Sequence, residues 1–153
     1  PIASGLEHDE LGHPTGSSKL HQQMVAKRRN KLRTLADTLP APQIHGPSEG
    51  NILLVGWGST QGPIREAVDR ARAAGDHVSS LHLKHLNPLP SGLEPLFAGF
   101  NHILVVEMNA GQMVEDVELS VKGLKPVHWY GKCGGDVPTP EEVMEEITKL
   151  MAS

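Results

Sequence analysis

The sequence predicts an α/β protein with a mostly parallel sheet, preceded by an N-terminal helical arm. From residue 51 onward, short apolar runs alternate with segments of helical periodicity. Continuous apolar runs are typical of strands buried on both faces, and their alternation with helices favours parallel pairing. The first 50 residues instead contain one long helical pattern between segments rich in glycine and proline. We therefore expect an arm over 1–50 and an α/β domain over 51–153.

The arm is expected to begin irregularly and then to form one helix. Glycine and proline are dense enough in 1–18 to argue against a helix or strand there. Ser17 or the next serine can cap a helix over 18–39, which the prolines of 40–42 end. The basic run 27–31 is either a solvated face of this helix or a contact with an acidic partner. The apolar stripe consists of Leu20, Met24, Val25, Leu32, Leu35 and Leu39.

The domain that follows is expected to contain four strands and four helices. The segment 40–50 resembles a linker because of its prolines and glycines. Thr139, Pro140 and Glu142 form the clearest helix start, since a threonine cap, a proline in the first turn and a capping-box glutamate coincide. The buried stripe of that helix is Val143, Ile147, Leu150 and Met151. The expected strands are 52–55, 78–83, 103–106 and 126–130, and the other helices are 63–75, 93–97 and 111–121.

Parallel strands place their carboxyl ends at one edge of the sheet, where ligands bind in such folds. Two of these ends combine glycine turns with polar side chains. Glu107 follows four apolar residues, so it either faces a ligand or partner loop or caps the next helix, and both readings stay open. The candidate interface or crevice residues are Gly56, Trp57, Gly58, Ser59, Thr60, Glu107, Asn109 and Gln112.

The turn after the first strand resembles a dinucleotide-binding fingerprint only in part. A third glycine would have to stand at position 61, which is glutamine. The acidic residue expected at the end of the second strand is also missing, and Lys84 and His85 stand there instead. No phosphate-binding Gly-Lys-Ser/Thr motif is present either. We therefore expect a tight turn whose glycines allow close packing.

Composition excludes several classes of protein. The 153 residues carry a formal net charge of -4, and 38% are hydrophobic, as in ordinary globular domains. One cysteine excludes a disulfide framework and any cysteine-rich zinc or iron–sulfur site. A mildly acidic chain with 3% aromatic residues lacks the features that nucleic-acid binding requires. Neither a membrane span nor a signal peptide is recognisable, so we expect a soluble, cytoplasmic protein.

Histidine and cysteine offer no recognisable reaction centre. The nine histidines form no His-Glu-x-x-His motif, and no two are spaced i, i+4 on an expected helix. His82 and His85 straddle a strand end, so we expect their side chains to point in different directions. Lys132 could lower the pKa of the Cys133 thiol, but no histidine is placed as a base, and an exposed thiol without a role is expected.

Five separated segments resemble the C-terminal part of the alpha subunit of 2-oxoacid:ferredoxin oxidoreductases, most closely the 2-oxoglutarate type. The resemblance runs from about residue 5 to about residue 112. After that it weakens, because no phenylalanine follows Pro138 in the segment 131–138. The matching segments are Gly5-Leu6-Glu7-His8-Asp9-Glu10, Met24-Val25-x-Lys27-Arg28, 53–67, Leu86-Asn87-Pro88-Leu89-Pro90 and Val105-Val106-Glu107-Met108-Asn109-x-Gly111-Gln112.

This resemblance implies a transketolase C-terminal-like domain, which is a three-layer α/β/α sandwich whose sheet can carry one antiparallel strand. It implies an enzyme that decarboxylates a 2-oxoacid on thiamine diphosphate, passes electrons through iron–sulfur clusters to ferredoxin and forms an acyl-CoA. In that family the thiamine-contacting residues lie in an upstream domain, and the diphosphate site and cluster cysteines lie in the beta subunit or other domains. No catalytic, cofactor-binding or metal-binding residue is therefore assigned to this chain.

The expected role is packing and subunit assembly. The chain would contact an upstream thiamine-binding domain and the beta subunit, with no nucleic-acid or membrane partner. Thiamine diphosphate, magnesium, iron–sulfur clusters, ferredoxin and CoA would belong to the whole complex. Pro1 and the single cysteine suggest a C-terminal piece of a longer protein. Two alternatives stay open, namely a stand-alone flavodoxin-like small-ligand-binding module and a small enzyme that uses Cys133.

Overall fold

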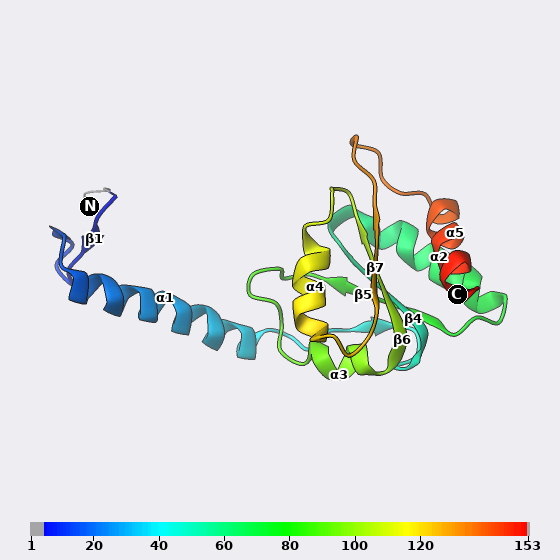
Figure 1. The fold of residues 1–153 in the computed structure, drawn as a ribbon, viewed down its shortest axis with the longest axis horizontal. Coiled ribbons are helices and arrows are strands. Elements are labelled where there is room, and N and C mark those ends of the chain that lie inside the picture. The colour runs from blue at the N-terminus through cyan, green and yellow to red at the C-terminus, as the bar shows by residue number, and fades with distance from the viewer. Residues whose placement is uncertain (1–4, 153) are drawn as a thin grey trace. The chain divides into compact units, whose positions relative to one another are not determined.

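The computed structural model describes residues 5–152, in two compact units of which one ends at Leu39 and the other begins at Pro40. In the first unit, β1 (Glu7–His8) pairs antiparallel with β2 (Pro14–Thr15) ahead of α1 (Ser18–Thr38) (Figure 1). The expectation of an irregular segment over 1–18 is wrong here. The Asp9 carboxylate accepts hydrogen bonds from the backbone N–H groups of Leu11 and His13, which closes a tight turn.

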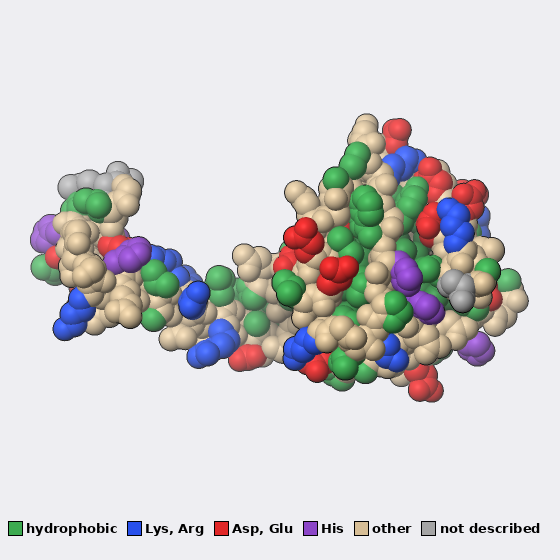
Figure 2. Space-filling view, in the orientation of Figure 1, with side chains coloured by type: hydrophobic (Ala, Val, Ile, Leu, Met, Phe, Trp, Pro, Cys, Tyr) green, Lys and Arg blue, Asp and Glu red, His purple; other side chains and the backbone are tan. Residues whose placement is uncertain are grey.

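The helix α1 begins and ends close to the expected residues. The Ser17 hydroxyl caps it by accepting a hydrogen bond from the Leu20 N–H at 3.3 Å. None of its residues is buried, and Leu32 and Leu35 are 42% and 44% exposed. The predicted stripe therefore exists as a helix face that is covered only in part, since Leu20, Met24, Val25 and Leu39 are half-buried. Lys and Arg side chains line the same helix (Figure 2).

The second unit is built on a five-stranded sheet in the order β3-β5-β4-β6-β7. Four strands are parallel, as predicted: β4 (Gly50–Trp57), β5 (Val78–Leu83), β6 (Phe100–Glu107) and β7 (Val127–Gly131). The fifth, β3 (Ile44–His45), runs antiparallel beside β5. Its residues were expected to lie in a linker, but Ile44 packs against one of the hydrophobic clusters and so anchors the edge.

Helices cover both faces of this sheet, which gives the three-layer sandwich (Figure 1). A short 3-10 helix, η1 (Gly58–Thr60), leads directly into α2. On one face lie α2 (Gln61–Ala73) and α5 (Pro140–Met151), and on the other lie α3 (Leu93–Ala98) and α4 (Met113–Val121).

Each inner strand contributes alternate side chains to two hydrophobic clusters. Ile52 and Leu54 of β4 pack on the α2/α5 side, and Leu53 and Val55 pack on the α3/α4 side. All four are 0% exposed, which confirms a strand buried on both faces. In the last helix Val143 and Ile147 are buried as predicted. Leu150 also packs against that cluster, whereas Met151 is 38% exposed, so the expected stripe ends at Leu150. Within residues 5–152, no helix is both long and apolar enough to cross a membrane.

Candidate functional site

The four parallel strands end along one edge of the sheet. In register, Gly56 lies beside His82 on one neighbour and Val106 on the other, and Glu107 lies beside Gly131. The predicted crevice residues therefore fall at one edge, in the two loops that follow β4 and β6.

Glu107 is completely buried, although it ends a strand in a loop-rich region. Its Oε2 accepts a hydrogen bond from the Met113 N–H at 2.8 Å, and its Oε1 accepts one from the Val114 N–H at 3.0 Å. These N–H groups belong to the first turn of α4, where backbone donors have no partner within the helix. Of the two readings left open, helix capping is the one observed, since both oxygens are engaged by the helix start.

Asn109 and Gln112 are part of the same loop. The Asn109 Oδ1 accepts hydrogen bonds from the N–H groups of Gly111 at 2.9 Å and Gln112 at 3.0 Å. This is a local side-chain-to-backbone turn that brings the chain into α4. Asn109 is thus used to shape the loop, and the Gln112 side chain is exposed.

The turn that follows β4 is held in the same way. The buried Thr60 hydroxyl donates to the Trp57 carbonyl at 2.9 Å and accepts from the Trp57 N–H at 3.1 Å. A side chain at position 56 would collide with Ile64 and Thr60, so Gly56 allows α2 to approach the strand. This confirms the tight packing turn predicted after this strand.

One contact joins the two loops across the edge. The Ser59 hydroxyl lies 3.1 Å from the Met108 sulfur, which places the turn after β4 against the loop after β6. Gly58 and Ser59 are exposed, whereas Thr60 and Glu107 are buried. The eight predicted residues therefore lie at one edge of the sheet, where Gly58, Ser59 and Gln112 are exposed. The buried side chains of Thr60 and Glu107 bond to nearby backbone groups.

A second feature of this edge lies at the end of β5. A cavity of about 180 Å³ is lined there by His82, Lys84 and His85, together with Arg65 of α2 and the segment 40–43. The two histidines were expected to point apart, yet both line this cavity. The sequence shows that Lys84 and His85, and no acidic residue, follow this strand. Arg65 joins them only because α2 packs beside β5, which the sequence pattern does not reveal.

Two buried ring nitrogens lie at the ends of β4 and β5. Among residues 5–152, the Trp57 Nε1 and the His82 Nδ1 are buried without a hydrogen-bond partner. Burial, followed by the charges of Arg65 and Lys84, lowers the pKa of His82. Unpartnered buried nitrogens are uncommon in folded proteins, and a bound water or a ligand is the usual partner of such a group.

Cys133 is exposed, in a loop beside Lys132. The Lys132 Nζ lies 2.8 and 2.9 Å from the two carboxylate oxygens of Glu142 at the start of α5. Glu142 also accepts the Thr139 N–H at 2.7 Å, which confirms the predicted capping box. The bond to Glu142 raises the pKa of Lys132. The lysine is therefore held by the helix start and not by the thiol.

The other histidines are spread over both units. His102 Nδ1 and His128 Nε2 lie 3.1 Å apart on β6 and β7, where burial and then His102 lower the pKa of His128. In the part of the chain that the structure describes, no group of three His, Cys, Asp or Glu residues is placed to hold a metal ion.

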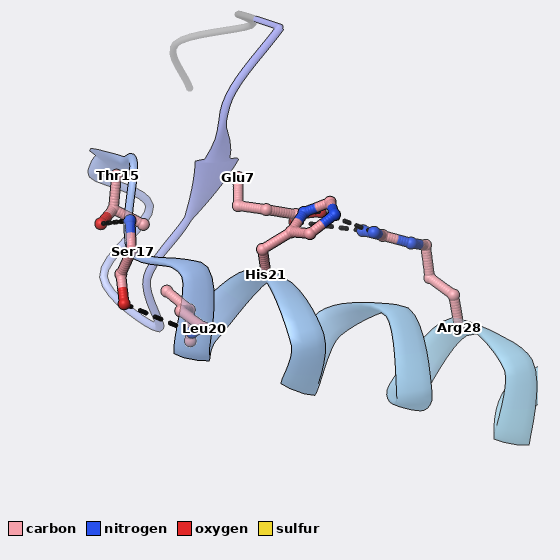
Figure 3. A network of polar contacts seen from close by, with 6 residues as sticks. All are labelled: Glu7, Thr15, Ser17, Leu20, His21 and Arg28. Carbon is pink, nitrogen blue, oxygen red and sulfur yellow. Dashed lines mark hydrogen bonds and ion pairs between the residues drawn. The ribbon is translucent and has the colours of Figure 1, made fainter.

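The first unit carries its own polar network (Figure 3). The Glu7 carboxylate of β1 accepts hydrogen bonds from Arg28 at 2.6 and 3.1 Å and lies 3.1 Å from the His21 Nδ1. Only 14% of the Glu7 side chain is exposed, and hydrogen bonding, from Arg28 first and also from His21, lowers its pKa. This network fastens the hairpin onto α1. It connects two segments that the sequence resemblance had singled out separately.

Comparison with known proteins gives matches over both units. The family model described as pyruvate:ferredoxin oxidoreductase core domain II matches residues 50–143. The 2-oxoglutarate oxidoreductase subunit KorA of Mycobacterium tuberculosis is 34% identical over 124 residues, which cover 75% of this chain and 19% of that protein. Curated relatives are longer, and the matches to the first three cover 17%, 19% and 39% of their lengths.

Solved structures extend the comparison to the fold. The 2-oxoglutarate:ferredoxin oxidoreductase from Magnetococcus marinus, with 2-oxoglutarate, coenzyme A and succinyl-CoA bound, superposes with a TM-score of 0.84 and 33% identity. That match covers 98% of this chain and 26% of the other. A split-gene transketolase, an inactive beta4 tetramer, gives a TM-score of 0.58 over 72% of this chain and 41% of the other. At 16% identity it shows a shared transketolase-like fold.

Proposed function

Because the chain belongs to the pyruvate:ferredoxin oxidoreductase core domain II family, we propose that it is a non-catalytic packing domain of such an oxidoreductase. The complete enzyme would be a 2-oxoacid:ferredoxin oxidoreductase of the 2-oxoglutarate type, and this chain would be part of its alpha subunit. The named relatives are alpha subunits that are longer than the matched region, which favours a domain of a larger enzyme over a stand-alone ligand-binding module.

The observation that carries this proposal is the use of the polar groups at the carboxyl edge. Glu107, Asn109 and Thr60 all bond to backbone groups of their own loops or of α4. A reacting or substrate-binding group needs free hydrogen-bonding capacity directed at the ligand. These side chains instead fix the shape of an exposed surface, which suits a contact between domains.

The cofactors of the complete enzyme would lie elsewhere in the complex. An iron–sulfur cluster takes four cysteine ligands, and this sequence has one cysteine. Thiamine diphosphate and the clusters would be held by an upstream thiamine-binding domain, the beta subunit and other domains. Ferredoxin and CoA would be partners of the whole cytoplasmic complex.

Within this assembly, we assign the contact surface to the two loops joined by Ser59 and Met108. The turn over residues 56–60 is tightly packed beneath but exposed at Gly58 and Ser59. The loop over 107–112 is fixed by its own hydrogen bonds and needs no partner to take its shape. A preformed surface of this kind loses little conformational entropy when another domain packs on it.

A matched pair of variants tests the location of this contact. Ser59→Arg adds a long charged side chain at the carboxyl end of β4, and Ser48→Arg adds the same side chain shortly before its amino end. Both serines are exposed, so neither change disturbs the hydrophobic clusters. The complete alpha subunit carrying each variant would be co-produced with its beta subunit, and size-exclusion chromatography and 2-oxoglutarate-dependent ferredoxin reduction would be measured.

We expect Ser59→Arg to reduce assembly and turnover together, with Ser48→Arg close to the unmodified enzyme. If both variants assemble and turn over normally, the carboxyl edge is not the contact surface. If the unmodified alpha and beta subunits assemble but none of the 2-oxoacids tested supports ferredoxin reduction, the assigned enzyme class is wrong.

A further inference from the structure

The cavity at the end of β5 brings together basic side chains from three parts of the second unit. Lys84 and His85 follow the strand, His82 is its last but one residue, and Arg65 comes from the first turns of α2. The side chains of Gln43 and Gln61 line the same space, and Gln61 is the first residue of α2. Acidic residues are absent from the lining, which is composed of basic, amide and apolar side chains.

Unlike Arg70 of α2, the Arg65 and Lys84 side chains of this cavity have no carboxylate partner among residues 5–152. Arg70, one turn further along the helix, pairs with Glu66 at 2.9 Å and with Glu141 at 2.7 Å. Among residues 5–152, neither Arg65 nor Lys84 forms an ion pair with a carboxylate. Most exposed arginines are solvated at little cost, but two unpaired cations that line one cavity raise its electrostatic potential.

His82 adds an independent sign of a missing ligand. Its Nδ1 is buried and has no hydrogen-bond partner among the described residues. Its ring lines both this cavity and a small adjoining space of about 10 Å³ that also contacts His45 and Arg65. Burial of the His82 ring, and then the charges of Arg65 and Lys84, lower the pKa of His82. An anion between the two cations would offset the effect of their charges.

We propose that this cavity binds one phosphate group of a small ligand. Its volume of about 180 Å³ is below the ~300–1,000 Å³ of sites that enclose a drug-sized molecule, so it suits a single charged group. A phosphate carries about −1.5 to −2 charges at neutral pH, which two cations neutralise, whereas one carboxylate would leave them in excess. An arginine offers paired donors and a lysine a point charge, the combination that phosphate sites commonly use.

This site goes beyond the packing role and does not rest on it. Binding can be measured on the 153-residue chain without turnover, so the two proposals fail separately. Inorganic phosphate is the probe, titrated at constant ionic strength because surface charges are screened by salt. Histidine ring resonances followed by nuclear magnetic resonance report the binding, since His82 lies in the cavity. Acetate, titrated in the same way, tests whether a carboxylate is bound equally well.

The variants are Arg65→Gln, Lys84→Gln and the double change, and Arg72→Gln is the matched control. Arg72 lies at the other end of α2, is exposed and does not line this cavity. We expect a saturable phosphate-dependent shift of the His82 resonances in the unmodified chain. Each single variant should weaken binding about tenfold, the loss typical of one hydrogen bond to a charged group. The double variant should abolish the shift, and Arg72→Gln should leave it unchanged.

Three results would overturn the proposal. They are a non-saturable response in the unmodified chain, equal phosphate affinity in the double variant, and acetate binding as tight as phosphate binding. Far-ultraviolet circular dichroism of every variant establishes that the fold is retained. Because all the substituted side chains are exposed, we expect the spectra to be identical.

Discussion

The two units of the chain achieve order by different means. The α/β unit buries 23 hydrophobic residues in two clusters on either face of its sheet, whereas α1 in the first unit has no buried residue. The first unit is held together mainly by polar contacts between side chains. Among them, the Glu7–Arg28 bond involves a carboxylate side chain that is only 14% exposed. Exposed ion pairs contribute little to stability, and an amphipathic helix in water gains most of its stability from burial. The α/β unit thus carries its own fold, and we propose that the exposed apolar face of α1 is covered by another surface in the complete enzyme.

The largest effect is expected from a cavity in the α/β core. Phe97 of α3 is 1% exposed and lies in the cluster between the sheet and α3/α4. Phe97→Ala should lower the free energy of unfolding by about 3–5 kcal/mol, through lost burial and the empty space left behind. Urea unfolding followed by the fluorescence of Trp57 and Trp129, both in this unit, measures the change. Leu119→Ala, at a position that is 76% exposed, is the control and should have little effect.

The second effect concerns the buried carboxylate that caps α4. In Glu107→Gln an amide group would replace one of the two oxygens that accept the N–H groups of Met113 and Val114. One buried donor then loses its acceptor, which should cost about 1–3 kcal/mol of unfolding free energy. Glu115→Gln, exposed in the first turn of the same helix, should change it by less than about 0.5 kcal/mol. Equal effects of the two changes would show that capping by Glu107 is unimportant.

The third effect distinguishes the arm from the α/β unit by its response to acid. Arg28 and His21 lower the pKa of Glu7 in the folded arm, so their stabilising effect is complete above the ordinary value of 4.5. It is lost as the pH falls through the lower pKa of the folded state. Amide hydrogen–deuterium exchange in β1 and β2 should therefore accelerate below that range. Arg28→Gln should reduce this acid dependence, and Arg33→Gln should not. A part remains in every variant, because hydrogen bonds from the His13 and Leu11 N–H groups also lower the pKa of Asp9 in the same hairpin. An acid dependence as large in Arg28→Gln as in the unmodified chain would contradict the role of the pair.

The smallest effect is expected from the apolar face of α1. Leu35→Ser changes a side chain that is 44% exposed, so the unfolding free energy of the α/β unit should shift by less than about 0.5 kcal/mol. The same change in the assembled enzyme should weaken subunit association, since we assign this face to a contact with another surface. A loss above about 1 kcal/mol in the isolated chain would mean that the two units are not independent in stability.

Elements with strong local signals were predictable from the sequence. The runs 52–55 and 103–106 could only be buried strands, and the Thr139 capping box fixed the start of the last helix. The hairpin around Asp9 and the edge strand β3 were missed. Each of these strands has two residues, too few for a hydrophobic period, and β3 depends on a partner 37 residues further along the chain, Leu81.

The position of the candidate site was predictable from the sequence, but the hydrogen bonds that its side chains form were not. Strand ends located both loops, because parallel strands finish at one edge. Whether Glu107 faces outward or inward depends on where α4 begins relative to β6, and periodicity does not specify this to one residue. The basic cavity was hidden for a related reason. Its lysine and histidines were visible at a strand end, but Arg65 joins them only through the packing of α2 beside β5.

The two-residue length of β3 also affects how the protein behaves at high concentration. Open sheet edges present rows of unpaired backbone groups to which further chains can add. On one side the sheet ends in β3, a two-residue strand that pairs with Ser80 and Leu81 of β5. The long apolar strand β4 lies in the interior of the sheet, between β5 and β6. This short strand therefore limits edge-to-edge aggregation on that side of the sheet.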